Sequence, residues 1–233
     1  MHSKIIETIR KNRISSTEVA DALGKKGVIT DVAPLNSGHF VVGTVHYVCT
    51  WDESNWPLHE QIQDFPEHSI VYVDTIECEG RAIFGDLVAK SLLIYGGAKG
   101  VVVNGLLRDI HRLKKENYPI WCKGVSPIGC FNREVTLRPE IEQYQALQRQ
   151  KFSDAIFVAD DSGCVVIEKA EQSEEFLEKL EFIELQEDIW YFCTDTLKLS
   201  TYETICKKIY LQKPELLPIG LKERLEKYMG ELS

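Results

Sequence analysis

The chain of 233 residues lacks several features that mark broad classes of protein. No apolar run is long enough to span a bilayer, and Met1-His2-Ser3-Lys4 does not lead into the apolar centre of a secretory signal. We therefore expect a cytoplasmic location and no membrane partner. The seven cysteines include no CxxC pair, which indicates neither a zinc site nor a disulfide framework, so we expect most of them to be reduced core thiols.

Positive charge is also in short supply. The chain carries 27 Lys and Arg against 36 Asp and Glu, which gives a net charge of −9. A protein that binds nucleic acid neutralises phosphates with a basic face, so we expect no direct nucleic-acid partner. Gly96, Gly97 and Gly100 precede a predicted strand, whereas a dinucleotide fingerprint follows a strand and opens a helix, so we expect no Rossmann cofactor.

A composition that is 44% hydrophobic can bury one substantial core, or one core and a small appendage. Alternating patterns predict an α/β fold, with a helix that begins at a Ser15–Glu18 capping box and ends at Gly24 or Gly27. The predicted strands are 40–48, 70–74, 101–103, 120–123, 156–159 and 164–167, and the predicted helices are 86–95 and 109–117. Residues 160–163 are predicted to form a turn rather than a calcium loop.

Two short segments carry the clearest chemistry. Gly85 and Asp86 precede Leu87 and Val88, which begin a helical pattern, so the first backbone N–H groups of this helix lack internal acceptors and can bind a carboxylate or phosphate. Val101–Val103 reads as a buried parallel strand, and Arg108 and Asp109 follow its carboxyl end, where open α/β sheets bind ligands.

Together these segments suit a small 2-oxo acid. The amides would hold an anionic group, Arg108 would polarise an adjacent oxygen and Asp109 would hold a hard cation. Simpler explanations stay open for each part. Asp86 could be only a helix cap, Arg108 and Asp109 could cap the next helix or form a surface pair, and the glycines could be ordinary turn residues.

Residues 84–129, from Phe84-Gly85-Asp86-Leu87 to Ile128-Gly129, resemble the core of the RraA-like family. This family includes 4-hydroxy-4-methyl-2-oxoglutarate aldolases with oxaloacetate decarboxylase activity and the RraA regulators of ribonuclease E. Residues 17–24 resemble the family's first helix and residues 157–166 its closing hairpin. The resemblance implies a three-layer α/β/α swivelling domain over residues 1–170, assembled as a homotrimer or homohexamer.

The resemblance also implies roles for single residues. The backbone amides of Gly85, Asp86, Leu87 and Val88 match those that bind the substrate carboxylate. Arg108 matches the arginine at the keto oxygen, and Asp109 matches the carboxylate that holds Mg²⁺ or Mn²⁺. The implied activity is that of a metal-dependent (class II) lyase, which cleaves 4-hydroxy-2-oxo acids to pyruvate or decarboxylates oxaloacetate.

Three departures from the aldolase pattern keep other functions open. Arg112 stands where the aldolases have a second acid, and a cation there opposes the metal. Asn104 replaces a common acid, and the segment 35–40 is shorter than the aldolase region that supplies acid–base residues. The alternatives are a non-catalytic regulator with a protein partner, and an anion-binding member that has lost its metal. Asp109 favours the enzyme, because the ribonuclease regulators tend to lack that carboxylate.

Residues 171–233 lie outside this resemblance and predict a small, helix-rich α+β extension with a packing or assembly role. Its first part, 171–188, carries eight acids and one Lys, which indicates a solvated helix face. The apolar run 189–193 predicts a strand. A capping box at Ser200–Glu203 predicts an amphipathic helix that reaches Tyr210, and a short helix follows Pro218.

Overall fold

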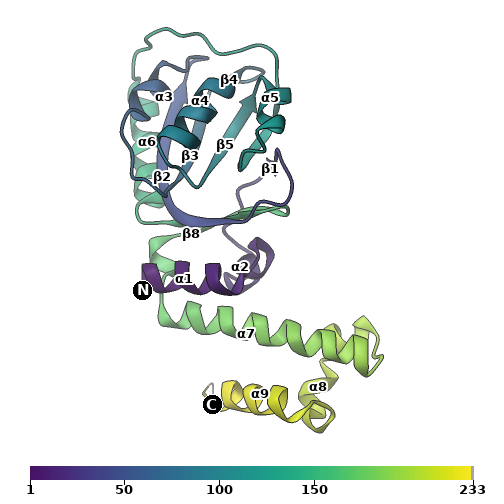
Figure 1. The fold of residues 1–233 in the computed structure, drawn as a ribbon. Coiled ribbons are helices and arrows are strands. Elements are labelled where there is room, and N and C mark those ends of the chain that lie inside the picture. The colour runs from purple at the N-terminus through teal and green to yellow at the C-terminus, as the bar shows by residue number, and fades with distance from the viewer. Residues whose placement is uncertain (232–233) are drawn as a thin grey trace. The chain divides into compact units, whose positions relative to one another are not determined.

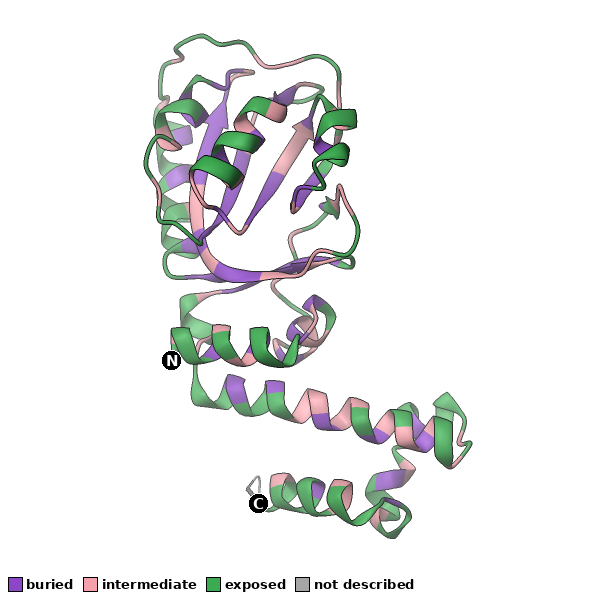
Figure 2. Cartoon of the chain, in the orientation of Figure 1, coloured by how far each residue is buried: buried purple, intermediate pink, exposed green. Residues whose placement is uncertain are grey.

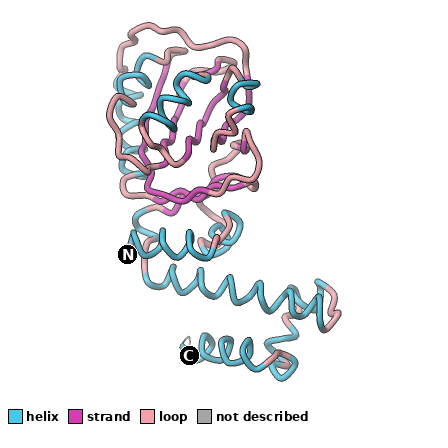
Figure 3. Tube along the Cα trace, in the orientation of Figure 1, coloured by secondary structure: helices cyan, strands magenta, loops and turns pink. Residues whose placement is uncertain are grey.

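The computed structural model describes residues 1–231 and separates into two compact units, Met1–Ser173 and a second that begins at Glu174 (Figures 1 and 3). Within the described residues no helix is both long and apolar enough to cross a membrane.

The first unit is built on one sheet with the strand order β1-β6-β5-β3-β2-β7-β8, in which β4 pairs with β5. Strands β2, β3, β5 and β6 run parallel, and the antiparallel partners β1 and β7 flank them. The segment before β1 bonds to β8, through Ile29 N–H to Cys164 O (3.0 Å) and Val166 N–H to Gly27 O (2.8 Å), so the sheet nearly closes. The strands are β1 (Ala33–Pro34), β2 (Val41–Trp51), β3 (Ile70–Ile76), β4 (Ala82–Phe84), β5 (Gly100–Leu107), β6 (Ile120–Val125), β7 (Ile156–Asp160) and β8 (Gly163–Ile167).

Helices cover both faces of this sheet, which confirms the expected α/β class. On one face, Leu58, Ala89 and Leu113 of three helices pack with Val71 and Val103 of the central strands. On the other face, α6 and the β7–β8 hairpin share a second core around Tyr72, Phe152 and Phe157. The helices of this unit are α1 (His2–Asn12), α2 (Ser16–Ala22), α3 (Trp56–Gln61), α4 (Asp86–Lys90), the π-helix η1 (Ser91–Tyr95), α5 (Ile110–Lys115), α6 (Pro139–Phe152) and the 3₁₀-helix η2 (Lys169–Glu171).

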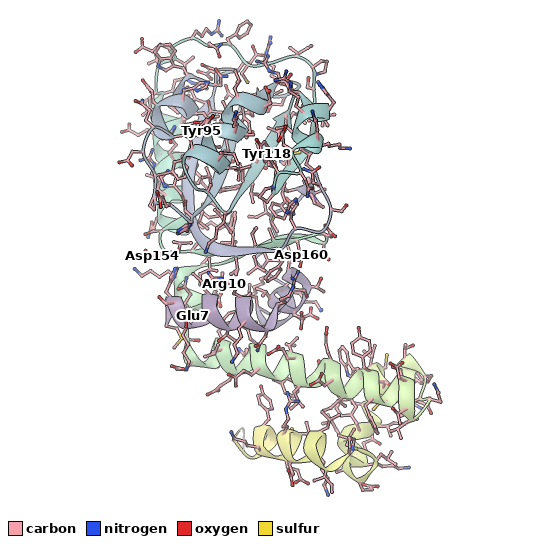
Figure 4. The ribbon with its side chains drawn as sticks, viewed as in Figure 1. Glu7, Arg10, Tyr95, Tyr118, Asp154 and Asp160 are labelled. Carbon is pink, nitrogen blue, oxygen red and sulfur yellow. The ribbon has the colours of Figure 1, made fainter. Side chains whose placement is uncertain are left out.

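The local sequence explains these elements. Val101–Val103 are completely buried in β5, as a run of β-branched residues predicts for a central strand (Figure 2). Ser15 and Glu18 form the predicted capping box of α2. The predicted turn at 160–163 joins the antiparallel strands β7 and β8, and Asp160 (Figure 4) accepts hydrogen bonds from the backbone and hydroxyl of Ser16 at 2.7 Å.

The second unit is helical throughout its described part, and the predicted strand at 189–193 is wrong. Ile189 and Cys193 continue the helical spacing from Leu185, and all three are buried in one core with Tyr210. The apolar run therefore extends a helix instead of forming a strand. The elements are α7 (Glu174–Tyr191), the π-helices η3 (Phe192–Thr196) and η4 (Tyr202–Cys206), α8 (Ile209–Gln212), the 3₁₀-helix η5 (Pro214–Leu216) and α9 (Ile219–Glu231).

The amphipathic helix predicted to reach Tyr210 is interrupted. Its capping box forms, because Ser200 and Glu203 exchange hydrogen bonds between side chain and backbone. Lys208 then adopts a left-handed conformation with φ of 49°, which divides η4 from α8. The turn carries Tyr210 into the core of this unit, where it is 1% exposed.

Candidate functional site

The two segments with the clearest chemistry meet at one edge of the sheet. Strand β4 runs parallel to the end of β5, with Phe84 beside Leu107. The Arg108 N–H donates to Phe84 O at 3.1 Å, so the residues after the two strands, Gly85 and Arg108, lie next to each other. This is the edge where parallel sheets bind ligands.

A cavity of about 230 Å³ lies at this edge. Its lining includes every residue that the sequence singles out for the site: Gly85, Asp86, Leu87, Val88, Arg108 and Asp109. It also includes Asn55, His59, Phe84 and Asn132. Helix α4 continues directly into η1, so the N–H groups of residues 86–88 begin a continuous helical segment that ends at Tyr95.

Two glycines make room for the charged side chains. A Cβ on Gly85 would lie 2.0 Å from Asp109 Oδ2, so this carboxylate rests directly against the turn that begins α4. A Cβ on Gly129 would lie 2.6 Å from Arg108 Nη1, so the guanidinium rests against that backbone. Any larger residue at either position would displace the charged group, which gives both glycines a steric role rather than a conformational one.

Asp109 has an unusual backbone conformation and no capping bond. Its φ of 57° is left-handed, and it precedes α5 without a hydrogen bond from its side chain to that helix. The alternative of a helix cap is therefore wrong for this side chain. Asp109 Oδ2 lies 3.7 Å from Arg108 Nε, and both side chains are almost half exposed, so part of the surface-pair alternative holds. Eleven other non-glycine residues within residues 1–231 have a positive φ, and aspartate adopts this conformation more readily than most residues, so the assignment of Asp109 rests on its position and not on its φ.

Arg112 pairs with Asp86. Its Nη1 lies 2.8 Å from Asp86 Oδ2. The hydrogen bond from the Arg112 guanidinium lowers the pKa of Asp86 below its ordinary value of 3.8. Asp86 therefore forms an ion pair and is more than the helix cap considered above. Its carboxylate balances part of the Arg112 charge that was expected to oppose a metal at Asp109.

Three residues of the cavity were missed at the level of sequence: Asn55, His59 and Asn132. Asn55 is the most informative, because it is 8% exposed and its Oδ1 has no hydrogen-bond partner within residues 1–231. An unpaired buried oxygen at a cavity wall favours a bound polar ligand or water. Asn55 precedes α3, His59 lies in the last turn of that helix, and Asn132 belongs to the irregular segment after β6, so no periodic signal marks them.

The residues around Asp109 suit magnesium in a limited way. Residues 1–231 contain no group of three or more His, Cys, Asp or Glu that could enclose a metal. Magnesium keeps several waters and is often held by one or two carboxylates together with the substrate. Asp109, backed by Gly85 and open to the cavity, fits that role, whereas the donor set does not suit a fully protein-enclosed ion.

A buried polar network supports the end of β5. Asp74 is 1% exposed, and its carboxylate accepts hydrogen bonds from Tyr47, Tyr144 and the amide of Asn104, the last at 2.8 Å. Thr75 donates its hydroxyl to the Asn104 carbonyl at 2.6 Å. Strands β3 and β5 stop pairing at Val103, so these bonds hold the strand that leads to Arg108.

Comparisons with known proteins agree with the fold. A family described as RraA-like, Aldolase/RraA, matches residues 16–166. "Protein DlpA" of Legionella pneumophila is 27% identical over 176 residues, which are 72% of this chain but only 28% of that protein. A protein of Halalkalibacterium halodurans named "Putative 4-hydroxy-4-methyl-2-oxoglutarate aldolase" is 29% identical over 184 residues, and the match covers 71% of this chain and 78% of that protein.

Solved structures show the same fold. Streptomyces coelicolor RraAS2, described as an unusual member of the RNase ES inhibitor RraA protein family, superposes with a TM-score of 0.58 at 19% identity, covering 79% of this chain and 94% of that one. An uncharacterized protein from Pseudomonas syringae gives a TM-score of 0.60 at 20% identity and covers 83% of this chain and 93% of its own. Similarity at this level of identity shows architecture and leaves activity to the site.

Proposed function

This chain belongs to the RraA-like family, and we propose that it is a divalent-metal-dependent lyase that cleaves 4-hydroxy-2-oxo acids to pyruvate or decarboxylates oxaloacetate. One observation carries the proposal. The first amides of α4, Arg108, Asp109 and the unpaired oxygen of Asn55 line a single cavity. In the proposal, the amides bind an anionic group, Arg108 binds an oxygen of the substrate and Asp109 binds a metal. Asn55 Oδ1 offers an unpaired hydrogen-bond acceptor.

The chemistry of such a cleavage explains the need for these groups. Breaking a carbon–carbon bond next to a carbonyl leaves an electron pair that becomes an enolate, and most of its charge resides on the former keto oxygen. In the proposed pose, the N–H groups of residues 86–88 hold the carboxylate, and Arg108 donates to the keto oxygen. Because the charge on that oxygen grows during bond cleavage, Arg108 stabilises the transition state more than the bound substrate.

We assign the metal to Asp109, with the remaining positions left to water and substrate oxygens. A bound divalent ion would supply Lewis-acid stabilisation of the keto oxygen. The protein's contribution is to place the carboxylate, and the close approach of Asp109 to Gly85 restricts where that carboxylate can lie. Asp109 therefore has both a metal-holding and a positioning role in the proposal.

An assay of pyruvate release tests the proposed activity. Oxaloacetate and 4-hydroxy-4-methyl-2-oxoglutarate are each supplied with and without Mg²⁺ or Mn²⁺, and the rate with metal alone is subtracted. We expect metal-dependent release that Asp109→Ala reduces to background. Asp154→Ala, which removes an exposed carboxylate that pairs with Lys169 on the surface, serves as the matched control and should keep the full rate. Failure of the wild-type protein with both substrates and several metals would rule out the lyase.

We also propose that the protein is a homo-oligomer that uses the surface beside the cavity. Leu87 is 77% exposed and Tyr95 is 73% exposed on the segment formed by α4 and η1, and Ile128 after β6 is 58% exposed. Leu87 lines the cavity, and exposed apolar side chains on a continuous helical segment favour a protein interface. Leu87→Glu with Tyr95→Glu is expected to lower the molar mass measured by light scattering to that of one chain, and an unchanged oligomer would contradict the assignment of this surface.

The unit that begins at Glu174 receives a packing or assembly role in this proposal. Its helices have a core of their own around Leu185, Ile189 and Tyr210. Truncation after Ser173 is expected to change the oligomer mass and to leave metal-dependent pyruvate release intact, because the residues assigned to the cavity all lie before that point. Loss of pyruvate release in a folded truncated protein would show that the second unit has a direct part in catalysis.

A further inference from the structure

Helix α3 brings two polar residues to the cavity. Asn55 precedes the helix and His59 lies one turn later, with the His59 N–H donating to Asn55 O at 3.1 Å, and both residues line the cavity. Residues four positions apart share one face of a helix, so a polar face of α3 forms part of the cavity wall. The roles proposed for the amides of residues 86–88, for Arg108 and for Asp109 leave this face without a part in substrate binding.

Asn55 is held in place by two contacts with other segments of the site. Its backbone N–H donates to Phe131 O at 3.1 Å, and its side-chain Nδ2 donates to Ile83 O at 3.4 Å. Ile83 belongs to β4 and lies two residues before Gly85, whereas Phe131 directly precedes Asn132 of the cavity lining. The Asn55 amide therefore has a defined position beside the turn that begins α4.

The contact with Ile83 also determines which atom of the Asn55 amide remains for a ligand. A carbonyl oxygen only accepts hydrogen bonds, so Nδ2 must face Ile83 O, because the flipped amide would place two oxygens against each other. Oδ1 is then the atom without a partner within residues 1–231, in a residue that is 8% exposed. A buried acceptor without a donor is costly, so the ligand that suits this wall brings a hydrogen-bond donor.

The substrates of the proposed lyase differ in this one property. With its carboxylates ionised, a 4-hydroxy-2-oxo acid has a single donor, the 4-hydroxyl, whereas the keto form of oxaloacetate has none. The N–H groups of residues 86–88 and the Arg108 guanidinium are donors, and they suit the carboxylate and the keto oxygen that both substrates share. Asn55 Oδ1 offers an acceptor that only the hydroxyl can use.

We propose that Asn55 is a specificity-determining residue that accepts a hydrogen bond from the 4-hydroxyl of the substrate. The site then prefers a 4-hydroxy-2-oxo acid to the same acid without the hydroxyl. This inference rests on the proposed function, which places the carboxylate and the keto oxygen in the cavity. A site that pairs a buried polar group with a substrate hydroxyl discriminates against the analogue that lacks it, because the analogue leaves the buried group unpaired.

Calorimetry with a matched pair of ligands tests the proposal without turnover. 4-Hydroxy-2-oxoglutarate and 2-oxoglutarate differ only in the 4-hydroxyl, and a chelator removes the divalent metal that the proposed cleavage requires. We expect the wild type to bind the hydroxy acid roughly tenfold more tightly, which is the effect of about one net hydrogen bond. Dissociation constants within about twofold of each other would overturn the assignment, because even a weak net hydrogen bond contributes more. Failure of both ligands to bind at millimolar concentration would also overturn it.

Variants of Asn55 assign the preference to its oxygen. Asn55→Leu removes the acceptor at nearly constant size, and Asn55→Ala removes it with less bulk, so each should bring the ratio of the two dissociation constants close to one. Asn36→Ala is the matched control, because Asn36 Nδ2 also donates to backbone carbonyls, those of Leu113 at 3.1 Å and Tyr118 at 2.9 Å. The control should keep the wild-type ratio. A preference that persists in both Asn55 variants would overturn the proposal.

The ratio separates this inference from the proposed activity. A general loss of structure weakens both ligands together, whereas loss of the Asn55 acceptor weakens only the hydroxy acid. A wild type that shows the preference but releases no pyruvate in the lyase assay would support the assignment of Asn55 and reject the lyase. A wild type that releases pyruvate but binds both ligands equally would do the reverse.

Discussion

Replacing Gly85 with alanine tests whether the site depends on the contact between the turn before α4 and Asp109. An added Cβ would lie 2.0 Å from Asp109 Oδ2 and 3.1 Å from Arg108 Cγ. The φ of Gly85 is −133°, which other residues also adopt, so the substitution acts through this contact and not through the sign of φ. It therefore perturbs the two proposed functional side chains while it leaves their chemistry intact.

The size of the effect follows from the distance. Non-bonded heavy atoms settle at about 3.5 Å, so the Asp109 carboxylate must retreat by more than about 1 Å. Both charged side chains are partly exposed and can move, so the loss of stability should fall at the low end of the roughly 1–3 kcal/mol typical of overpacking. A displacement of about 1 Å at a catalytic group can cost roughly 100-fold in rate. We expect a loss of that order in kcat/KM.

Metal-dependent pyruvate release from oxaloacetate and the midpoint of thermal unfolding are measured on the same preparations. Gly124→Ala on β6 is the matched control, because its Cβ would meet Leu106 Cδ2 at 3.3 Å and no charged side chain. The control should keep both properties close to those of the wild type. If Gly85→Ala keeps kcat/KM within about threefold of the wild type, a cutoff well inside the roughly 100-fold loss expected for such a displacement, the contact does not position a functional carboxylate.

Three further predictions concern the surroundings of the cavity. Asn104→Ala removes a hydrogen-bond donor from the buried Asp74 carboxylate and should lower the free energy of unfolding in urea by about 1.5–3 kcal/mol. Asn104→Asp should lower it more at neutral pH, because two carboxylates would then face each other. Equal losses in the two variants would contradict this role of Asn104. The Arg112 pair depresses the folded pKa of Asp86, so its stabilisation is present above the ordinary value of 3.8 and is lost as the pH falls through the lower folded pKa. Thermal unfolding of Arg112→Ala should therefore differ from the wild type at neutral pH and converge with it in acid, and a constant difference would refute the pair's contribution. Calorimetry with Mg²⁺ alone should show no tight binding, because Asp109 offers a single carboxylate. The same Mg²⁺ titration in the presence of pyruvate should give a saturable binding signal. Tight binding of Mg²⁺ alone would point to ligands outside this cavity.

Local patterns predicted two of the regular elements that carry the candidate site, β5 and the helix that begins at Asp86. The β-branched run at Val101–Val103 identifies a buried strand, and the apolar spacing after Gly85 identifies a helix start. Strand β4, which leads to Gly85, was not among the predicted strands, and its parallel pairing with β5 is what brings Gly85 beside Arg108. The hydrogen bond from Arg108 N–H to Phe84 O joins the ends of these two strands.

The features that the sequence analysis missed depend on tertiary contacts that local patterns do not reveal. Asn55 and Asn132 are 77 positions apart and reach the cavity from segments that no periodic pattern marks. Helix α6 is mostly polar, and its few buried residues, such as Ile141 and Phe152, are too sparse to produce a helical pattern. The run at 189–193 shows the opposite problem, since a short apolar stretch fits a strand or a buried helix equally well until its partners are known.

The charges around the cavity also bear on the metal. Within residues 1–231, Asp86 pairs with Arg112 and Asp109 lies near Arg108, so these four side chains sum to zero. Oxaloacetate brings two carboxylates, and the start of a helix offers only about half a positive charge. The substrate would therefore leave the site negative unless a divalent cation binds with it. Arg112 does not remove this need, because its charge is already balanced by Asp86. We accordingly expect Mg²⁺ and oxaloacetate to raise each other's affinity by the same factor, as linkage requires.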